Sequence, residues 1–171
     1  MFTDHNRMRA AFQALGELLS AEGQAASILV GGGAGLNLLG LIERATADVD
    51  VTARVERRAD GSLQLTNADP FPAALVRAIR TVARDLGLPA DWMNHEVAMQ
   101  WKAGMPPGIL DDVAWERYSA LTVGIVGRRA QITLKFFAAV NTGVTSVHMQ
   151  DLLTLRPAAD ELEAAIAWVL T

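Results

Sequence analysis

Apolar residues recur every three or four positions in four stretches of the chain, the spacing that places them on one face of a helix. The pattern predicts helices over residues 4–21, 71–86, 148–155 and 158–170. Gly87 ends the second of these, and Pro157 separates the last two. A shorter β-branched run from Ser27 to Val30 predicts a buried strand, which stops at three glycines and leads into a helix over 34–41.

Residues 44–57 show the two-residue alternation of a strand with one apolar face. Apolar residues share one parity: Val49, Val51, Ala53 and Val55. The other parity carries charged and hydroxylated side chains. Asp60 and Gly61 form a favoured hairpin dipeptide, so we expect residues 62–66 to be the antiparallel partner of this strand.

Two more elements follow in the second half of the chain. Residues 121–126 predict a strand, and the apolar stretch 131–140 is expected to open as a strand and continue as a helix. Strands interleaved with helices predict the α/β (α+β) fold class. With 171 residues, 51% of them hydrophobic, the chain fits a single domain over 1–171 with a helical C-terminal segment. The four tryptophans are expected to be packing residues.

Charge and cysteine content narrow the function classes. The net charge of −4 argues against a globally basic nucleic-acid-binding surface. The absence of cysteine excludes disulfides, zinc–thiolate sites and thiol nucleophiles. The first seven residues are too polar for a secretory signal, so we expect a cytoplasmic location. The longest uncharged run, 28–42, is shorter than the ~17–25 residues of a membrane helix, so no membrane association is expected.

The candidate chemistry lies between residues 28 and 51. On a strand, Arg44, Thr46, Asp48 and Asp50 point to one face, with successive members about 7 Å apart at Cα. Two carboxylates at that spacing can bind one hard divalent ion or bridge a pair, as in phosphoryl-transfer sites. Upstream, the glycine turn exposes backbone N–H groups that favour phosphate. Either feature alone is also typical of a solvated strand edge or a tight turn.

Two other phosphate-binding motifs are excluded. The dinucleotide pattern requires glycine where the chain has Leu36 or Leu38. The P-loop requires Lys and Ser or Thr after Gly40, where the chain has Leu41 and Ile42.

The order of these features resembles the DNA polymerase beta-like nucleotidyltransferase superfamily, in the branch of abortive-infection nucleotidyltransferase toxins and their small relatives. The core of the resemblance is Val30-Gly31-Gly32 followed by Arg44-x-Thr46-x-Asp48-x-Asp50. Four later segments are also similar: 88–94, Leu134-Lys135, 148–155 and 161–169. The resemblance implies a nucleotidyltransferase-type mixed sheet flanked by helices.

The resemblance also implies roles for individual residues. Asp48 and Asp50 would be catalytic and bind Mg²⁺, with Mn²⁺ as the alternative ion. Gly31 and Gly32 would hold the nucleotide phosphates, and Lys135, the third catalytic candidate, would contact phosphate. The superfamily usually has a third carboxylate on a neighbouring strand; Glu96 is the candidate here for this metal ligand, and Asp91 is the alternative.

Three side chains keep two interpretations each. Arg44, which shares a face with Thr46 and Asp48, is expected to pair with a carboxylate or to meet a triphosphate, and we count Arg44 and Thr46 as nucleotide-binding candidates. Lys135 is a phosphate ligand or a lysine whose stem crosses apolar surface. His148 with Asp151 is a hydrogen-bonded pair or an auxiliary ligand.

The expected function is transfer of a nucleoside monophosphate from a nucleoside triphosphate to a hydroxyl of RNA or protein, with a toxin-like role and an antitoxin-like partner. The alternative is a catalytically weakened nucleotidyltransferase fold that binds nucleotide or protein. That alternative is motivated by the unplaced third acid and by the uncharged stretch after Lys135. A hydrolase that uses the same carboxylates is a third hypothesis.

Overall fold

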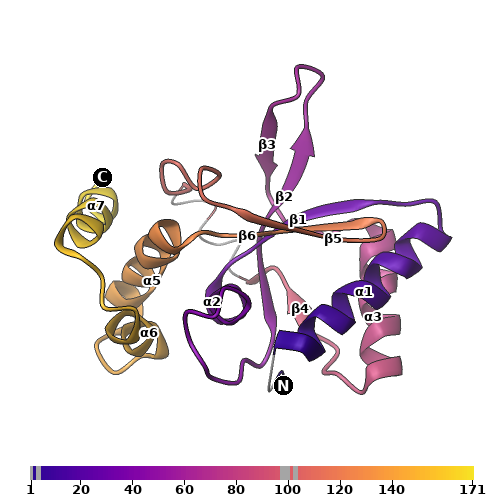
Figure 1. Ribbon diagram of the computed structural model, residues 1–171, viewed down its shortest axis with the longest axis horizontal. Coiled ribbons are helices and arrows are strands. Elements are labelled where there is room, and N and C mark those ends of the chain that lie inside the picture. Colours follow the sequence, from indigo (N-terminus) through magenta and orange to yellow (C-terminus); the bar gives the residue numbers. More distant parts are fainter. Residues whose placement is uncertain (1, 3–4, 97–100, 102–103) are drawn as a thin grey trace.

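A mixed sheet of six strands organises the fold (Figure 1). The computed structural model describes residues 2, 5–96, 101 and 104–171. Its strands are β1 (Ala26–Val30), β2 (Val49–Arg57), β3 (Leu63–Thr66), β4 (Met93–Asn94), β5 (Ala114–Tyr118) and β6 (Leu121–Ile125). Five of them follow the order β3-β2-β1-β6-β5, and β4 pairs with the first residues of β2. β1 runs parallel to β6, and β4 runs parallel to β2, whereas the other neighbours are antiparallel.

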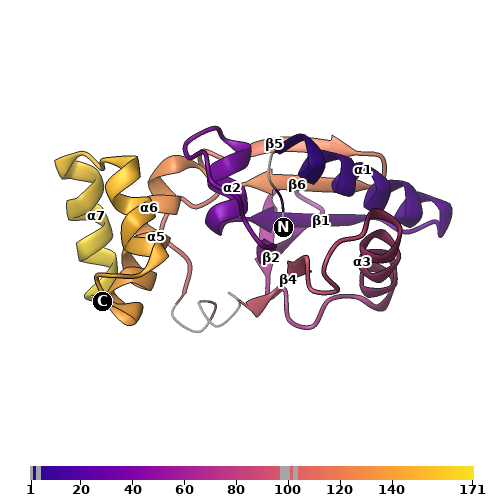
Figure 2. The ribbon, with the colours of Figure 1, turned by 90° about the horizontal axis from the view of Figure 1, so that it is seen from below.

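The helices form two groups at opposite ends of the sheet (Figures 1 and 2). α1 (His5–Ala21) and α3 (Ala73–Leu86) lie against one face at one end. α5 (Arg128–Thr142), α6 (Val147–Leu155) and α7 (Ala159–Val169) pack together at the other end. α2 (Gly32–Leu38) follows β1 and lies between the two groups.

The main core forms between the sheet and the pair α1 and α3. Phe12 of α1 and Ile79 of α3 pack there against Val30 and Val51 of the strands. Trp92, fully buried in the same core, donates a hydrogen bond from Nε1 to the carbonyl of Ile79 (3.1 Å). The predicted apolar faces of both helices are therefore confirmed.

A register shift between β1 and β2 changes which face the apolar residues of β2 occupy. Leu29 pairs with Ala53 whereas Val30 pairs with Val51, so Thr52 is the extra residue of a bulge. Val49 and Val51 accordingly belong to the main core, but Ala53 and Val55 belong to a second cluster with Leu29 on the opposite face. The expectation that all four share one face is therefore wrong, because simple alternation does not anticipate the bulge.

Several other sequence expectations are corrected. Residues 128–142 are helical throughout, so the predicted strand opening of 131–140 is absent. Strand β2 begins at Val49 rather than at Arg44, and only an isolated bridge joins Thr46 to Phe2.

Among the described residues, no helix combines the length and apolar character needed to cross a membrane.

Candidate functional site

The glycine turn after β1 and the first residues of β2 lie against each other. The Gly31 amide donates a hydrogen bond to the Asp50 carbonyl (3.2 Å). Gly32 has φ +63°, and a Cβ at this position would clash with Oδ2 of Asp50. The Asp50 carboxylate therefore occupies space that only a glycine leaves open. This contact joins the two halves of the motif, which are separate in the sequence.

Asp48 is held from the short strand β4. Asn94 of β4 is the register partner of Asp50, and its Nδ2 donates to Oδ2 of Asp48 (3.0 Å). The buried Thr46 hydroxyl donates to the Asp48 carbonyl (3.2 Å). The backbone at Asp48 and one carboxylate oxygen are thus positioned, while the other oxygen has no hydrogen-bond partner among the described residues.

Asp50 experiences an electrostatic environment that disfavours its charge. Burial, followed by the neighbouring charge of Asp48, raises the pKa of Asp50 to about 6. Glu96 raises the pKa further, whereas Lys135 and Arg44 oppose the shift. A bound cation between these carboxylates would relieve their repulsion.

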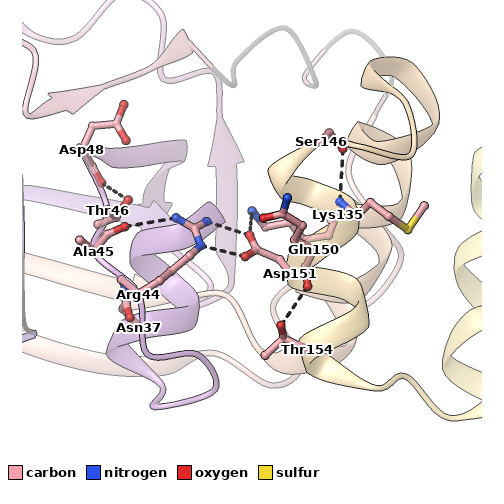
Figure 3. Close-up of polar contacts among 11 residues, drawn as sticks. Asn37, Arg44, Ala45, Thr46, Asp48, Lys135, Ser146, Gln150, Asp151 and Thr154 are labelled. Carbon is pink, nitrogen blue, oxygen red and sulfur yellow. Dashed lines mark hydrogen bonds and ion pairs between the residues drawn. The ribbon is translucent and has the colours of Figure 1, made fainter.

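Beside this pair, the carboxylate of Asp151 on α6 pairs with two basic side chains, Arg44 and Lys135 (Figure 3). Arg44 donates from Nε and Nη2 to the two carboxylate oxygens, each at 2.9 Å, and Lys135 Nζ lies 2.7 Å from Oδ2. Lys135 and Asp151 are both buried, while the Arg44 side chain is 35% exposed. Burial alone would raise the pKa of Asp151, but the hydrogen bonds from Arg44 and Lys135 lower it below its usual value.

This cluster shows the partners of its basic residues. Arg44 pairs with a carboxylate, as one interpretation held, but the partner is Asp151 rather than an acid of its own segment. Lys135 does not extend its ammonium to solvent, because that group is buried against Asp151. Sequence reasoning missed this role of Asp151, although a lone acid within the apolar stretch of α6 was an available signal.

His148 has a different environment from the one expected. Its buried Nδ1 has no hydrogen-bond partner among the described residues, and the Asp151 carboxylate is engaged by Arg44 and Lys135 instead. Burial, followed by the charge of Lys135, lowers the pKa of His148. The hydrogen-bonded pair His148 and Asp151 is therefore not present.

A small cavity with both polar and apolar walls adjoins Asp50. It has a volume of about 40 Å³, and its lining includes Gly32, Asp50, Thr52, Gln131 and Lys135. Gln131 is fully buried, and neither its amide nitrogen nor its amide oxygen has a partner in the described structure. A cavity of this size has room for a water molecule, which could satisfy such groups.

The candidates for the third carboxylate differ in position. Glu96 follows β4, is exposed, and is close enough for its charge to raise the pKa of Asp50. Asp91 is exposed in the turn that precedes β4. Within the described ranges, no three Asp, Glu or His side chains are grouped so as to hold a metal ion.

Comparison with known proteins adds no identification: no family model, curated protein or solved structure matches this chain. A function must therefore be inferred from the site itself.

Proposed function

We propose that the protein is a metal-dependent nucleotidyltransferase that transfers a nucleoside monophosphate from a nucleoside triphosphate to a hydroxyl of RNA or protein. The observation that carries this proposal is the contact between Gly32 and the Asp50 carboxylate, with Asp48 beside it. It brings a glycine turn, which favours phosphate, next to two acids, which favour a divalent cation.

The donor set fits Mg²⁺ bound together with substrate. Mg²⁺ commonly uses one or two protein carboxylates and completes its shell with water and substrate phosphates. Asp48 and Asp50 would hold the ion, and the raised pKa of Asp50 is consistent with a site whose nearby cations, Arg44 and Lys135, are paired with Asp151. When bound, the ion would neutralise charge on the triphosphate.

The remaining groups would orient the triphosphate. The Gly31 amide already donates a hydrogen bond to the Asp50 carbonyl, so the Gly32 amide is the better hydrogen-bond donor to a phosphate. Arg44 has a partly exposed guanidinium and could approach phosphate while it keeps its bond to Asp151. Lys135 would act through its positive charge near Asp50.

The test is incubation of the protein with radiolabelled nucleoside triphosphates, Mg²⁺ and either total RNA or cell lysate. We expect an acceptor to become labelled, and Asp48→Ala to lower labelling by about 100-fold or more because a charge-stabilising group is lost. Asp85→Ala is the matched control, since Asp85 is an exposed acid on α3. Labelling that persists in Asp48→Ala would refute the assignment.

A second candidate function is nucleotide or protein binding without transfer. It is favoured by one observation: Asp151 engages both Arg44 and Lys135, which leaves less positive charge for a triphosphate. Calorimetry with nucleoside triphosphates, with and without Mg²⁺, distinguishes the two functions. Tight binding without labelling of any acceptor supports the binding function.

A further inference from the structure

A second feature, away from the glycine turn, is an uncovered stretch of the sheet. α1 and α3 cover one face of the strands, while no described helix covers the opposite face at that end (Figures 1 and 2). Two adjoining hollows, of about 450 and 310 Å³, lie on this open face. They share Ser27, Val55, Arg117 and Thr122 in their linings.

Strand register places these residues in one row. Arg117 of β5 pairs with Thr122 of β6, which pairs with Ser27 of β1. Val55 of β2 continues the row, and Arg57 lies two residues further along the same strand and lines the larger hollow. The floor of the two hollows is therefore formed by small side chains, two of which carry hydroxyl groups, and an arginine lies at each side.

An exposed tryptophan borders the larger hollow. Trp115 is 41% exposed, contrary to the expectation that the tryptophans are packing residues. Its ring lies over Gly124: a Cβ there would be 2.7 Å from Cζ3 and 2.9 Å from Cη2 of the ring. Close contact with the Gly124 backbone fixes the orientation of the ring, so little entropy would be lost if a ligand stacked on it.

The charge of the surface is positive. The guanidinium groups of Arg57 and Arg117 donate to the carbonyls of Gly61 (2.9 Å) and Ser119 (3.3 Å), and neither forms an ion pair among the described residues. Each retains further N–H donors. The one acid in the lining, Glu116, is committed elsewhere, since its carboxylate accepts hydrogen bonds from Arg9 and Tyr118.

We propose that this face binds single-stranded RNA, with a base stacked on Trp115 and phosphates bound by Arg57 and Arg117. Aromatic side chains beside arginines on an open sheet are the elements that recognise unpaired nucleotides. Arg57 and Arg117 arise from strands three spacings apart, about 14 Å, and their guanidinium groups bond to separate carbonyls, those of Gly61 and Ser119, so a ligand that meets both arginines and the ring must extend across the strands. The occupant is therefore a chain of nucleotides rather than a mononucleotide.

The chemistry of the surface also separates RNA from other polyanions. A duplex keeps its bases stacked on one another, so Trp115 would have no base to contact. An acidic peptide would pair with the arginines but has no base to stack on the Trp115 ring. The hydroxyls of Ser27 and Thr122 on the floor suit the 2′-hydroxyl that distinguishes RNA from DNA.

Fluorescence anisotropy with a labelled 12-nucleotide single-stranded RNA, without nucleotide or Mg²⁺, tests the proposal. Trp115→Ala should weaken binding roughly 5- to 150-fold, the range for loss of one stacked base. The double variant Arg57→Ala/Arg117→Ala should reduce the slope of log K against log salt by about 1.4, because two phosphate contacts are lost. Thermal melting of each variant, and Trp115→Phe as a conservative substitution, show that the fold is retained.

Arg58→Ala is the matched control. Arg58 is next to Arg57 in the sequence, but its side chain donates a hydrogen bond to Gln64. Gln64 pairs with Glu56, and both side chains lie on the face opposite to Val55, so Arg58 is directed away from the hollows. It should leave the affinity and the salt slope unchanged. We expect weaker binding of the RNA duplex, of DNA of the same sequence and of polyglutamate used as a competitor.

Any of four results would overturn the proposal: no RNA binding at low salt, equal binding by duplex or DNA, full displacement by polyglutamate, or equal loss in Arg58→Ala. RNA binding at this face does not depend on the proposed transfer reaction. The binding assay contains neither nucleoside triphosphate nor Mg²⁺, so the two proposals can fail separately.

Discussion

Asp50 and Asp151 are two aspartates near Lys135, one half-buried and one fully buried, with opposite electrostatics. Asp151 accepts hydrogen bonds from Arg44 and Lys135, and these lower its pKa despite burial. Asp50 has Asp48 as its neighbour, and burial together with that charge raises its pKa to about 6. Burial alone thus does not show the role of an acid. Its direct partners determine whether it forms ion pairs between elements or remains able to bind a cation.

The largest effect is expected at Asp151, whose charge is compensated by Arg44 and Lys135. Asp151→Ala would leave the buried ammonium of Lys135 without a counter-ion and release Arg44 from α6. We expect a loss of about 3 kcal/mol in the free energy of unfolding, at the low end for buried pairs because Arg44 is partly exposed. Urea denaturation measures it.

Asp160→Ala provides the control for that experiment. Asp160 pairs with Arg129 through side chains that are both more than half exposed, so water and salt screen the pair and its removal should change the free energy of unfolding far less. Equal losses in the two variants would mean that the buried pair contributes no more than a surface pair.

A smaller effect is the difference in stability between two glycine variants, one of which disturbs Asp50. Gly32→Ala places a Cβ against Asp50 in addition to straining a residue at φ +63°. Gly40→Ala is the matched variant, because Gly40 has φ +67° and a methyl group there would meet no atom within 4 Å. Gly40→Ala should cost about 1–2 kcal/mol for the left-handed conformation alone, and Gly32→Ala about 1–3 kcal/mol more.

The difference between these two glycine variants in thermal or urea unfolding isolates the contact with Asp50. If both variants lose the same stability, the carboxylate moves aside freely and the turn does not position it.

The smallest effect is a pH dependence. Asp50 has a folded pKa of about 6 against 3.8 in the unfolded chain, so the folded state binds more protons between these values. Its contribution to stability is fully present below about pH 4 and is lost as pH rises through about 6. A pKa of about 6 against 3.8 corresponds to about 3 kcal/mol at full strength, which water around the partly exposed carboxyl reduces. Asp50→Asn should therefore be about 1–2 kcal/mol more stable than the unmodified protein at pH 7.5 and nearly equal to it at pH 4.

Urea unfolding at pH 4, 5.5 and 7.5 measures this difference. Asp151 has the opposite sign, because its pKa is lowered in the folded state: its stabilisation is present above about pH 4 and is lost as pH falls further. A gain in Asp50→Asn that is independent of pH would show that the carboxyl is ionised equally in both states.

Prediction from sequence succeeded where the signal is local. The helices near 5–21, 73–86, 147–155 and 159–169 and the β2–β3 hairpin all follow from apolar periodicity and turn residues within each segment. The two-residue strand β4 was not anticipated, because it is too short to show a period and exists only by pairing with β2. Strand β5 was also missed, since its burial is uneven and Trp115 is exposed.

For the candidate site, the sequence by itself determined the parts: a glycine turn, two alternate aspartates and an isolated lysine in an apolar stretch. Tertiary structure alone decided their partners. Arg44 and Asp151 are 107 residues apart, and Asn94 meets Asp48 from a distant strand. Periodicity assigns a residue to a face of its own element, but long-range packing determines which charge comes to face it. That is why one aspartate is compensated and the other is not.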